Sequence, residues 1–124
     1  MAGELNCACR ARLSPGFELD AQLCIPFDQS PVTVLFGPSG SGKTTLLRML
    51  AGLDRPAEGA ITFRGERWFD ASRSLCLPPQ KRRAGFLFQD YALFPHLTVA
   101  RNIAFNARPG KGREFLQAFG LADL

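Results

Sequence analysis

The sequence has little of what metal sites and membrane segments require. Histidine, tryptophan and tyrosine each occur once among 124 residues, and the four cysteines form no Cys-x-x-Cys pair. We therefore expect no metal site built from cysteine and histidine. No run of about 18 apolar residues occurs, so no segment is expected to insert into a membrane. The N-terminus lacks a basic and then apolar leader, so no secretory signal is expected.

Charge is also limited. The net charge is +4 and the apolar content is 46%, which is typical of a soluble globular chain. The only dense cluster of one sign is Lys81-Arg82-Arg83. A solvated turn before a strand explains this cluster better than a nucleic-acid patch does, so no nucleic-acid partner is predicted. Cys7 and Cys9 are two positions apart and would share one face of a strand, as buried, reduced thiols.

The most informative stretch is Gly37-Pro38-Ser39-Gly40-Ser41-Gly42-Lys43-Thr44-Thr45. It fits the phosphate-binding pattern G-x-x-x-x-G-K-[ST], which matches by chance in roughly 0.5% of chains of this length. The apolar, β-branched run Val32–Phe36 before it predicts a buried strand of a parallel sheet. Leu46, Leu47 and Leu50 predict a helix over Lys43–Ala51. Strand, glycine-rich loop and helix are the context that the pattern requires.

This arrangement predicts ATP binding. Glycines allow successive backbone N–H groups to point at one spot, where a helix also begins. Lys43 would add a full positive charge for the β- and γ-phosphates, and the Thr44 hydroxyl would bind Mg²⁺. Thr45 would contact an inner phosphate.

The rest of the chain alternates short strands and turns. The alternation of apolar and polar residues predicts a hairpin of two strands, and Leu77-Pro78-Pro79 is expected to block regular structure. Thr98 is expected to cap a helix that runs to about Ala107. The other expected elements are strands over Glu4–Arg10, Phe17–Ile25, Ala60–Arg64, Arg67–Asp70 and Gly85–Gln89, and a helix over Gly112–Phe119.

Several segments together resemble the ATP-binding subunit of ABC transporters. They are the phosphate loop, Phe88-Gln89-Asp90, and Leu93-Phe94-Pro95-His96-Leu97-Thr98-Val99. Leu77-Pro78-Pro79-Gln80-Lys81-Arg82-Arg83 is similar to importer ATPases, especially those for molybdate. The resemblance runs from about residue 30 to the end. It implies an α/β fold: a P-loop NTPase (RecA-like) core with an N-terminal antiparallel β subdomain.

The resemblance also implies roles for individual residues. Gln89 would be the glutamine that reaches Mg²⁺ and the attacking water, and Phe17 is the nearest candidate to stack on adenine. Phe17 also continues the apolar face of its strand, so core packing is an alternative. The loop aromatics Tyr91 and Phe94 would contact the membrane subunit or, equally well, pack on the domain.

The implied partners are transmembrane permease subunits and a second copy of the ATPase, with ATP and Mg²⁺ as ligands. The implied location is cytoplasmic, peripheral on the inner face of the membrane. The family's Leu-Ser-Gly-Gly-Gln segment and its strand ending in Asp-Glu do not occur in these 124 residues. We therefore expect a partial nucleotide-binding domain, truncated at the start of the helical subdomain and inactive alone. Its parts would be the β subdomain and core over about 1–90 and the glutamine loop with the first helices over about 89–124.

Two alternatives remain open from the residues. One is another P-loop protein, such as a nucleotide kinase or a DNA-repair ATPase. The other is a module that binds nucleotide without turnover.

Overall fold

The computed structural model describes residues 3–29, 32–90 and 92–123. The chain forms two compact units, one within Met1–Phe86 and the other within Leu87–Leu124. Each unit is described by itself.

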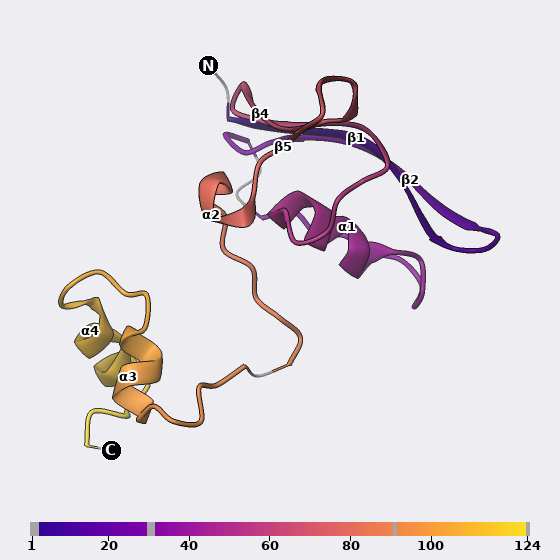
Figure 1. Ribbon diagram of the computed structural model, residues 1–124. Helices are drawn as coiled ribbons and strands as arrows, with labels where there is room; N and C mark the ends of the chain where they lie inside the picture. Colours follow the sequence, from indigo (N-terminus) through magenta and orange to yellow (C-terminus); the bar gives the residue numbers. More distant parts are fainter. Residues whose placement is uncertain (1–2, 30–31, 91, 124) are drawn as a thin grey trace. The chain divides into compact units, whose positions relative to one another are not determined.

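The first unit is built on one antiparallel sheet with the order β2-β1-β3-β4-β5 (Figure 1). Its longest pairing joins β1 to β2, and β1 pairs with β3 on its other side. The hairpin expected from the sequence is therefore confirmed. The strands are β1 (Glu4–Ser14), β2 (Phe17–Pro26), β3 (Glu58–Phe63), β4 (Glu66–Asp70) and β5 (Leu75–Cys76).

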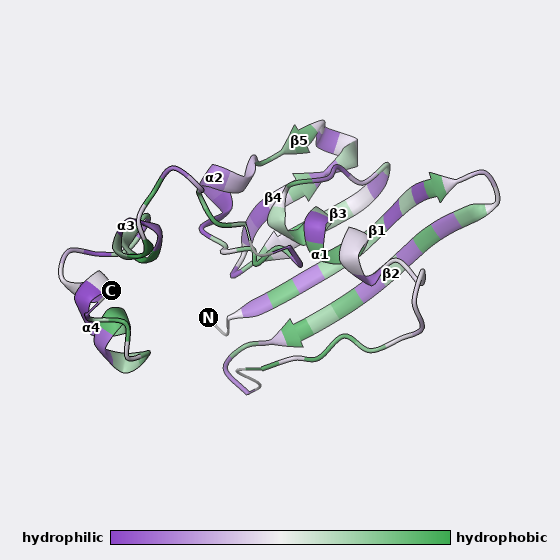
Figure 2. Ribbon diagram, turned by 90° about the horizontal axis from the view of Figure 1, so that it is seen from below, coloured by the Kyte–Doolittle hydropathy of each residue, from purple (hydrophilic) through white to green (hydrophobic). Residues whose placement is uncertain are grey.

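Alternation along β1 decides which face of the sheet is covered. Leu5, Cys7 and Cys9 are buried while the residues between them are exposed, and Figure 2 shows this as alternating bands of hydropathy along β1 and β2. A strand turns successive side chains to opposite faces, so one face collects the apolar set. The predicted burial of Cys7 and Cys9 is confirmed.

Helix α1 (Lys43–Ala51) covers this apolar face. Its residues Leu46 and Met49 join Ile61 and Phe69 of the sheet in one buried cluster. The helix has the bounds that the sequence predicted, and Gly52 follows it in the left-handed conformation that ends helices.

Two short helical segments complete the first unit, the 3₁₀ turn η1 (Ala71–Arg73) and α2 (Pro79–Arg82). The expectation that Leu77-Pro78-Pro79 blocks regular structure is wrong for Pro79, which opens α2. Proline is well suited to the first turn of a helix, because its missing N–H would have no intrahelical partner there.

The second unit pairs two helices, α3 (Val99–Ala104) and α4 (Lys111–Ala118). The Thr98 hydroxyl accepts a hydrogen bond from the Arg101 N–H at 3.3 Å, as the predicted cap requires. Gly112 packs on Ala104: a Cβ at Gly112 would lie 3.1 Å from the Ala104 Cβ.

Two predicted strands are not formed. Val32–Phe36 and Gly85–Gln89 have no regular structure, and Phe36 is 95% exposed and Leu87 96% exposed. A strand of a parallel sheet is stabilised by backbone bonds to neighbouring strands. Within the described residues, every strand pairing is antiparallel and none includes Val32–Phe36. The apolar pattern alone therefore predicted more structure than this segment adopts.

Among the residues described, none of the helices has the length and apolar character needed to cross a membrane.

Candidate functional site

The phosphate loop is a tight turn that leads directly into α1. The Ser41 N–H donates to the Pro38 carbonyl at 3.2 Å. Gly42 has φ +92°, and a Cβ there would lie 3.1 Å from Leu19 Cδ1. Both the positive φ and the close approach of Leu19 favour glycine at this position.

The Lys43 side chain folds back over this loop. Its Nζ donates to the Gly37 carbonyl at 2.8 Å, the Pro38 carbonyl at 2.6 Å and the Ser41 hydroxyl at 3.3 Å. These contacts hold the ammonium group against the loop, beside the first turn of α1. A charged group in this place is available to a phosphate oxygen that approaches the loop.

The first backbone amides of α1 add to this positive end. The intrahelical bonds begin with the Leu46 N–H, which donates to the Gly42 carbonyl at 2.9 Å. The N–H groups of Lys43, Thr44 and Thr45 therefore precede the helix ladder, and the first turn carries no acidic side chain. Such a helix start attracts anions through its N–H groups and its dipole.

A hollow of about 590 Å³ lies over this helix start. Among the lining residues, all of them described, Lys43 is the one with a charge. Phe17 also lines the hollow and is 38% exposed. Phe17 stands outside the buried core cluster of the first unit, which favours a surface role over core packing. The lining residues are Leu13, Phe17, Ser39, Gly40, Gly42, Lys43, Thr44 and Thr45.

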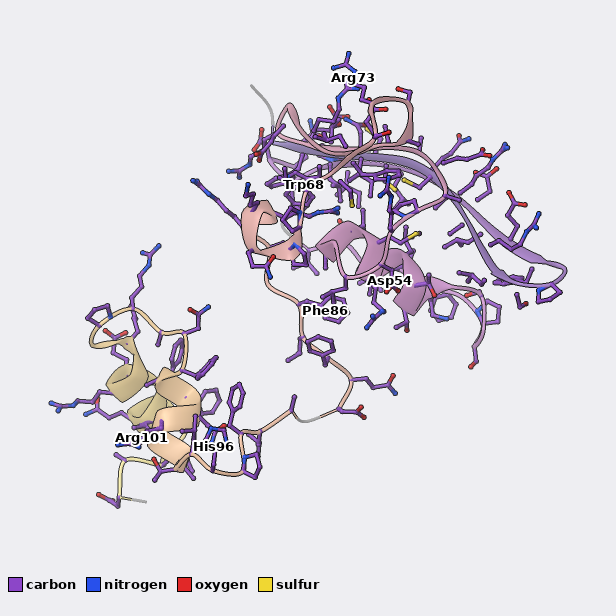
Figure 3. The ribbon with its side chains drawn as sticks, viewed as in Figure 1. Asp54, Trp68, Arg73, Phe86, His96 and Arg101 are labelled. Carbon is purple, nitrogen blue, oxygen red and sulfur yellow. The ribbon has the colours of Figure 1, made fainter. Side chains whose placement is uncertain are left out.

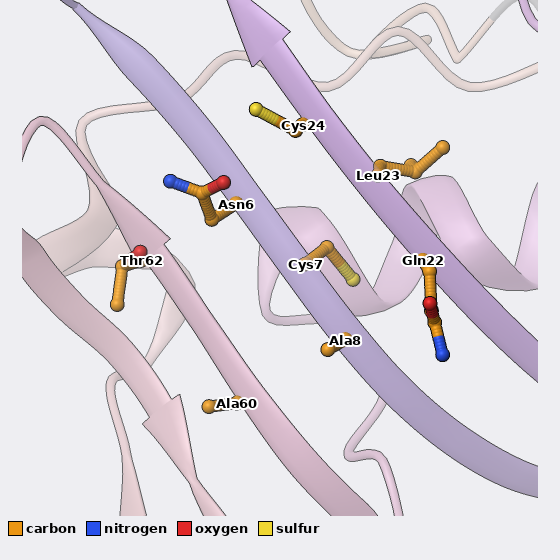
Figure 4. Close-up of a pocket in the computed structure, with 8 residues that line it drawn as sticks. All are labelled: Asn6, Cys7, Ala8, Gln22, Leu23, Cys24, Ala60 and Thr62. Atoms are coloured by element: carbon orange, nitrogen blue, oxygen red, sulfur yellow. The ribbon is translucent and has the colours of Figure 1, made fainter.

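A second hollow, of about 400 Å³, lies on the sheet itself (Figure 4). Its lining is neutral and shares no residue with the loop hollow. Cys24, on its rim, donates its thiol to the Glu4 carboxylate at 2.5 Å, and this hydrogen bond raises the pKa of Cys24. The hollow is lined by Asn6, Cys7, Ala8, Gln22, Leu23, Cys24, Ala60 and Thr62. This set offers no cationic group for a phosphate.

Gln89 belongs to the second unit, where it is exposed in a bend after Phe88. The structure thus brings Phe17, Lys43 and Thr44 together in the first unit, while Gln89 is described only within its own unit. Tyr91 lies outside the described residues. Phe94 packs on Phe105 with ring centroids 4.3 Å apart, and Leu93 is 73% exposed.

Sequence reasoning missed Asn102, which organises the loop after Gln89. Its Nδ2 donates to the carbonyls of Phe94 (3.1 Å), Leu97 (3.0 Å) and Thr98 (3.0 Å), and its Oδ1 accepts from the Phe94 N–H at 2.8 Å. The signal available in the sequence was an asparagine in the first turns of a helix, where its intrinsic propensity is poor and a side-chain task is common.

The predicted solvent exposure of Arg82 is wrong. The sequence suggested a solvated cluster, and Lys81 and Arg83 are indeed exposed, but Arg82 is only 1% exposed. The charge pattern gave no signal for this, because the local helix α2 turns its last residue inward.

Comparison with known proteins places the chain in a family. The family model described as ABC transporter matches residues 22–124. The chain is 53% identical over 97 residues to the "Molybdenum import ATP-binding protein ModC" of Pseudomonas aeruginosa, which covers 78% of this chain and 26% of that protein. It is 47% identical over 124 residues to the protein of the same name from Thiobacillus denitrificans, covering 99% of this chain and 33% of that protein. The chain thus spans about a quarter to a third of the length of these relatives. On the family match and these identities, the chain belongs to the ABC transporter family.

Proposed function

We propose that this chain binds ATP at Gly37–Thr45, as part of the ATPase subunit of an ABC importer. The observation that carries the proposal is the loop geometry. The Lys43 ammonium group and the leading N–H groups of α1 lie at one hollow whose described lining holds no carboxylate. This donor set is suited to a polyphosphate and unsuited to a cation alone.

Each residue has a distinct role in this proposal. Lys43 exchanges its contacts with the Gly37 and Pro38 carbonyls for the β- and γ-phosphates. The amides of Gly40 and Gly42 would bind the β-phosphate, the Ser41 amide would exchange its bond to the Pro38 carbonyl for the same phosphate, and Thr45 would contact an inner phosphate. Phe17 stacks on the adenine, since it lines the same hollow.

The donor set also fits a magnesium–nucleotide complex, because Thr44 adds a hydroxyl oxygen at the helix start. Mg²⁺ takes oxygen ligands and neutralises charge on the phosphates. Thr44 would hold it, and the resemblance to the family implies Gln89 as a second ligand. Gln89 can do so without adding charge, because its amide is neutral, and the same amide can orient water.

Hydrolysis and transport are proposed for a protein with the full length of these relatives. There, ATP hydrolysis would power import of a solute across the membrane, and the names of the relatives favour molybdate. The partners would be transmembrane permease subunits and a second copy of the subunit. The location would be the inner face of the cell membrane. The second unit would supply contacts to the permease through the loop after Gln89.

The proposed architecture follows from the family. Residues 1–90 would supply an antiparallel β subdomain and the beginning of a RecA-like core. Residues 89–124 would supply the glutamine loop and the start of the helical subdomain. The five-stranded antiparallel sheet is consistent with the first of these parts.

The test is ATP binding by the chain and by its Lys43→Ala variant. We expect saturable binding of a fluorescent ATP analogue, and a rise in Kd of about 100-fold in Lys43→Ala, because charge-assisted bonds to phosphate are lost. Lys81→Ala removes an exposed lysine of the same unit and is the matched control. Binding that is indifferent to the Lys43 charge would contradict the proposal.

A further inference from the structure

Arg82 is a charged residue with its whole side chain inside the first unit. It is 1% exposed. Its guanidinium donates to carbonyls of the segment before it and of two other elements. Nε reaches the Leu77 carbonyl at 2.8 Å, Nη1 reaches Met49 at 2.8 Å and Leu50 at 3.0 Å, and Nη2 reaches Trp68 at 3.4 Å.

Backbone carbonyl dipoles, a cysteine sulfur and an aromatic ring surround the positive charge of Arg82. Burial lowers the pKa of Arg82 from its usual value, and the nearby Cys76 sulfur, 3.9 Å from Nη2, opposes this. The guanidinium also lies over the Trp68 ring, 5.7 Å from its centroid. Figure 3 shows Trp68 between the sheet and the helices of this unit. Because the Met49 and Leu50 carbonyls belong to the last turn of α1, Arg82 stands at the negative end of this helix dipole.

The fit around Arg82 is close enough to restrict its neighbour Gly52. A Cβ on Gly52 would lie 2.7 Å from Arg82 Nε and 2.9 Å from Cζ, and Gly52 has φ +82°. The guanidinium therefore fills the space directly beyond the helix end. This joins α1 to β4 and to the segment Leu77–Arg82.

We propose that Arg82 is a positioning residue for the phosphate loop, acting through α1. This inference rests on the proposed function. Helix α1 carries Lys43 and Thr44 at one end and the Arg82 contacts at the other. A nine-residue helix is about 13 Å long, so a tilt of about 10° would displace one end relative to the other by roughly 2 Å. A displacement of that size is enough to misalign amides that must meet phosphate oxygens.

Removal of the guanidinium would take its hydrogen bond from the half-buried Leu50 carbonyl and leave the Met49 carbonyl with the Gly52 N–H alone, 3.1 Å away. The last turn of α1 would then shift to hydrate these carbonyls. Among the described residues, the hydrogen-bond partners of Arg82 and the Trp68 ring beside it are not part of the loop hollow's lining, so Arg82 would act on ATP affinity by holding the helix. A role limited to stability would lower the unfolding temperature and leave the affinity of folded molecules unchanged.

The experiment measures Kd for ATP in Arg82→Met, Arg82→Lys and Lys81→Met. Each is measured at low temperature, with the folded fraction taken from circular dichroism and Kd expressed per folded molecule. We expect Kd to rise about tenfold in Arg82→Met, less in Arg82→Lys, and by under about twofold in the exposed control Lys81→Met. In Arg82→Ala, added methylguanidine should restore affinity while methylammonium should not. An unchanged Kd in folded Arg82→Met would overturn the inference.

A measurement on the unaltered chain covers the case in which the variants do not fold. Binding and helix position are linked, so ATP should slow hydrogen exchange at Arg82 Nε by at least about fivefold and leave exposed Arg73 unchanged. Equal exchange at Arg82 with and without bound ATP would overturn the inference. Failure of the proposed function would give different results. Either the unaltered chain would not bind ATP, or it and Lys43→Ala would bind ATP equally well.

Discussion

Asp70 and Arg82 are the charged residues that the first unit buries among the residues described. Asp70 is matched by donors on both carboxylate oxygens. Oδ1 accepts from the Ser72 N–H at 3.0 Å and from the Ser72 hydroxyl at 2.6 Å, while Oδ2 accepts from Arg67. Arg73 lies farther away, 3.7 Å from Oδ2. The Ser72 hydrogen bond and then the Arg67 guanidinium lower the pKa of Asp70 to about 2.

This pKa predicts a specific loss of stability in acid. The carboxyl of an unfolded chain titrates near pKa ~3.9. Because the folded value is lower, the stabilisation is fully present above about pH 4 and is lost as the pH falls toward about 2. Urea unfolding at a series of pH values, followed by the fluorescence of Trp68, should show the fall. Asp70→Asn should show a smaller fall over this range.

Ser72→Ala provides the matched comparison for Asp70, since it keeps the carboxylate and removes its strongest donor. We expect the acid transition of Ser72→Ala to move to higher pH, because the folded pKa of Asp70 rises. An acid profile that is the same in the unaltered chain, Asp70→Asn and Ser72→Ala would show that Asp70 does not contribute.

At the scale of elements, the pairing of β1 with β3 depends on Gly59. Gly59 lies opposite Cys9 in the register, with φ +98°. A Cβ at this position would lie 1.8 Å from the Ala8 carbonyl oxygen. Gly65 has a similar φ of +80° but no atom within 4 Å of its would-be Cβ. Comparing a substitution at Gly59 with one at Gly65 therefore separates the cost of a direct clash from the cost of backbone strain.

We expect Gly65→Ala to lower the free energy of unfolding by about 1 kcal/mol, the usual cost of a left-handed alanine. Gly59→Ala should cost more than about 3 kcal/mol, because β1 and β3 must separate to admit the methyl group. Urea unfolding followed by Trp68 fluorescence measures both. Equal losses in the two variants would mean that the β1–β3 approach at Gly59 can relax.

The sequence predicted those elements whose signal is local. Helix α1 has the predicted bounds because its apolar spacing and Gly52 are both local signals. The β1–β2 hairpin followed from alternation around Pro15-Gly16. The predicted strand over Val32–Phe36 failed because strand formation depends on neighbouring strands, which a pattern of apolar residues cannot supply.

The same distinction applies to the site. The loop glycines, Lys43 and Thr44 form a contiguous motif, so the sequence identified them together. Arg82 and Asn102 act on backbone carbonyls that the fold brings to them, and their Met49 and Phe94 contacts span 33 and 8 positions. Such contacts leave no spacing rule in the sequence.

At the scale of the whole molecule, we expect this chain to bind ATP without hydrolysing it. The phosphate loop, with Lys43 and the start of α1, lies within the first unit. We therefore expect ATP binding to need only parts that the chain contains. In the family that the chain resembles, hydrolysis also needs a Leu-Ser-Gly-Gly-Gln segment from a second copy and an acidic strand end. Neither occurs in the 124 residues. We expect that these 124 residues alone would neither orient water nor neutralise charge in the transition state.

We therefore expect the 124-residue chain to bind ATP and to release no phosphate above background in the presence of magnesium. A phosphate-release assay on the chain and on Lys43→Ala measures this, with the binding assay on the same samples as the control for folding. Equal background release in both, together with binding that Lys43→Ala weakens, is the expected result. Turnover by the unaltered chain that Lys43→Ala abolishes would contradict it, because the groups that activate water would then have to lie among the residues present.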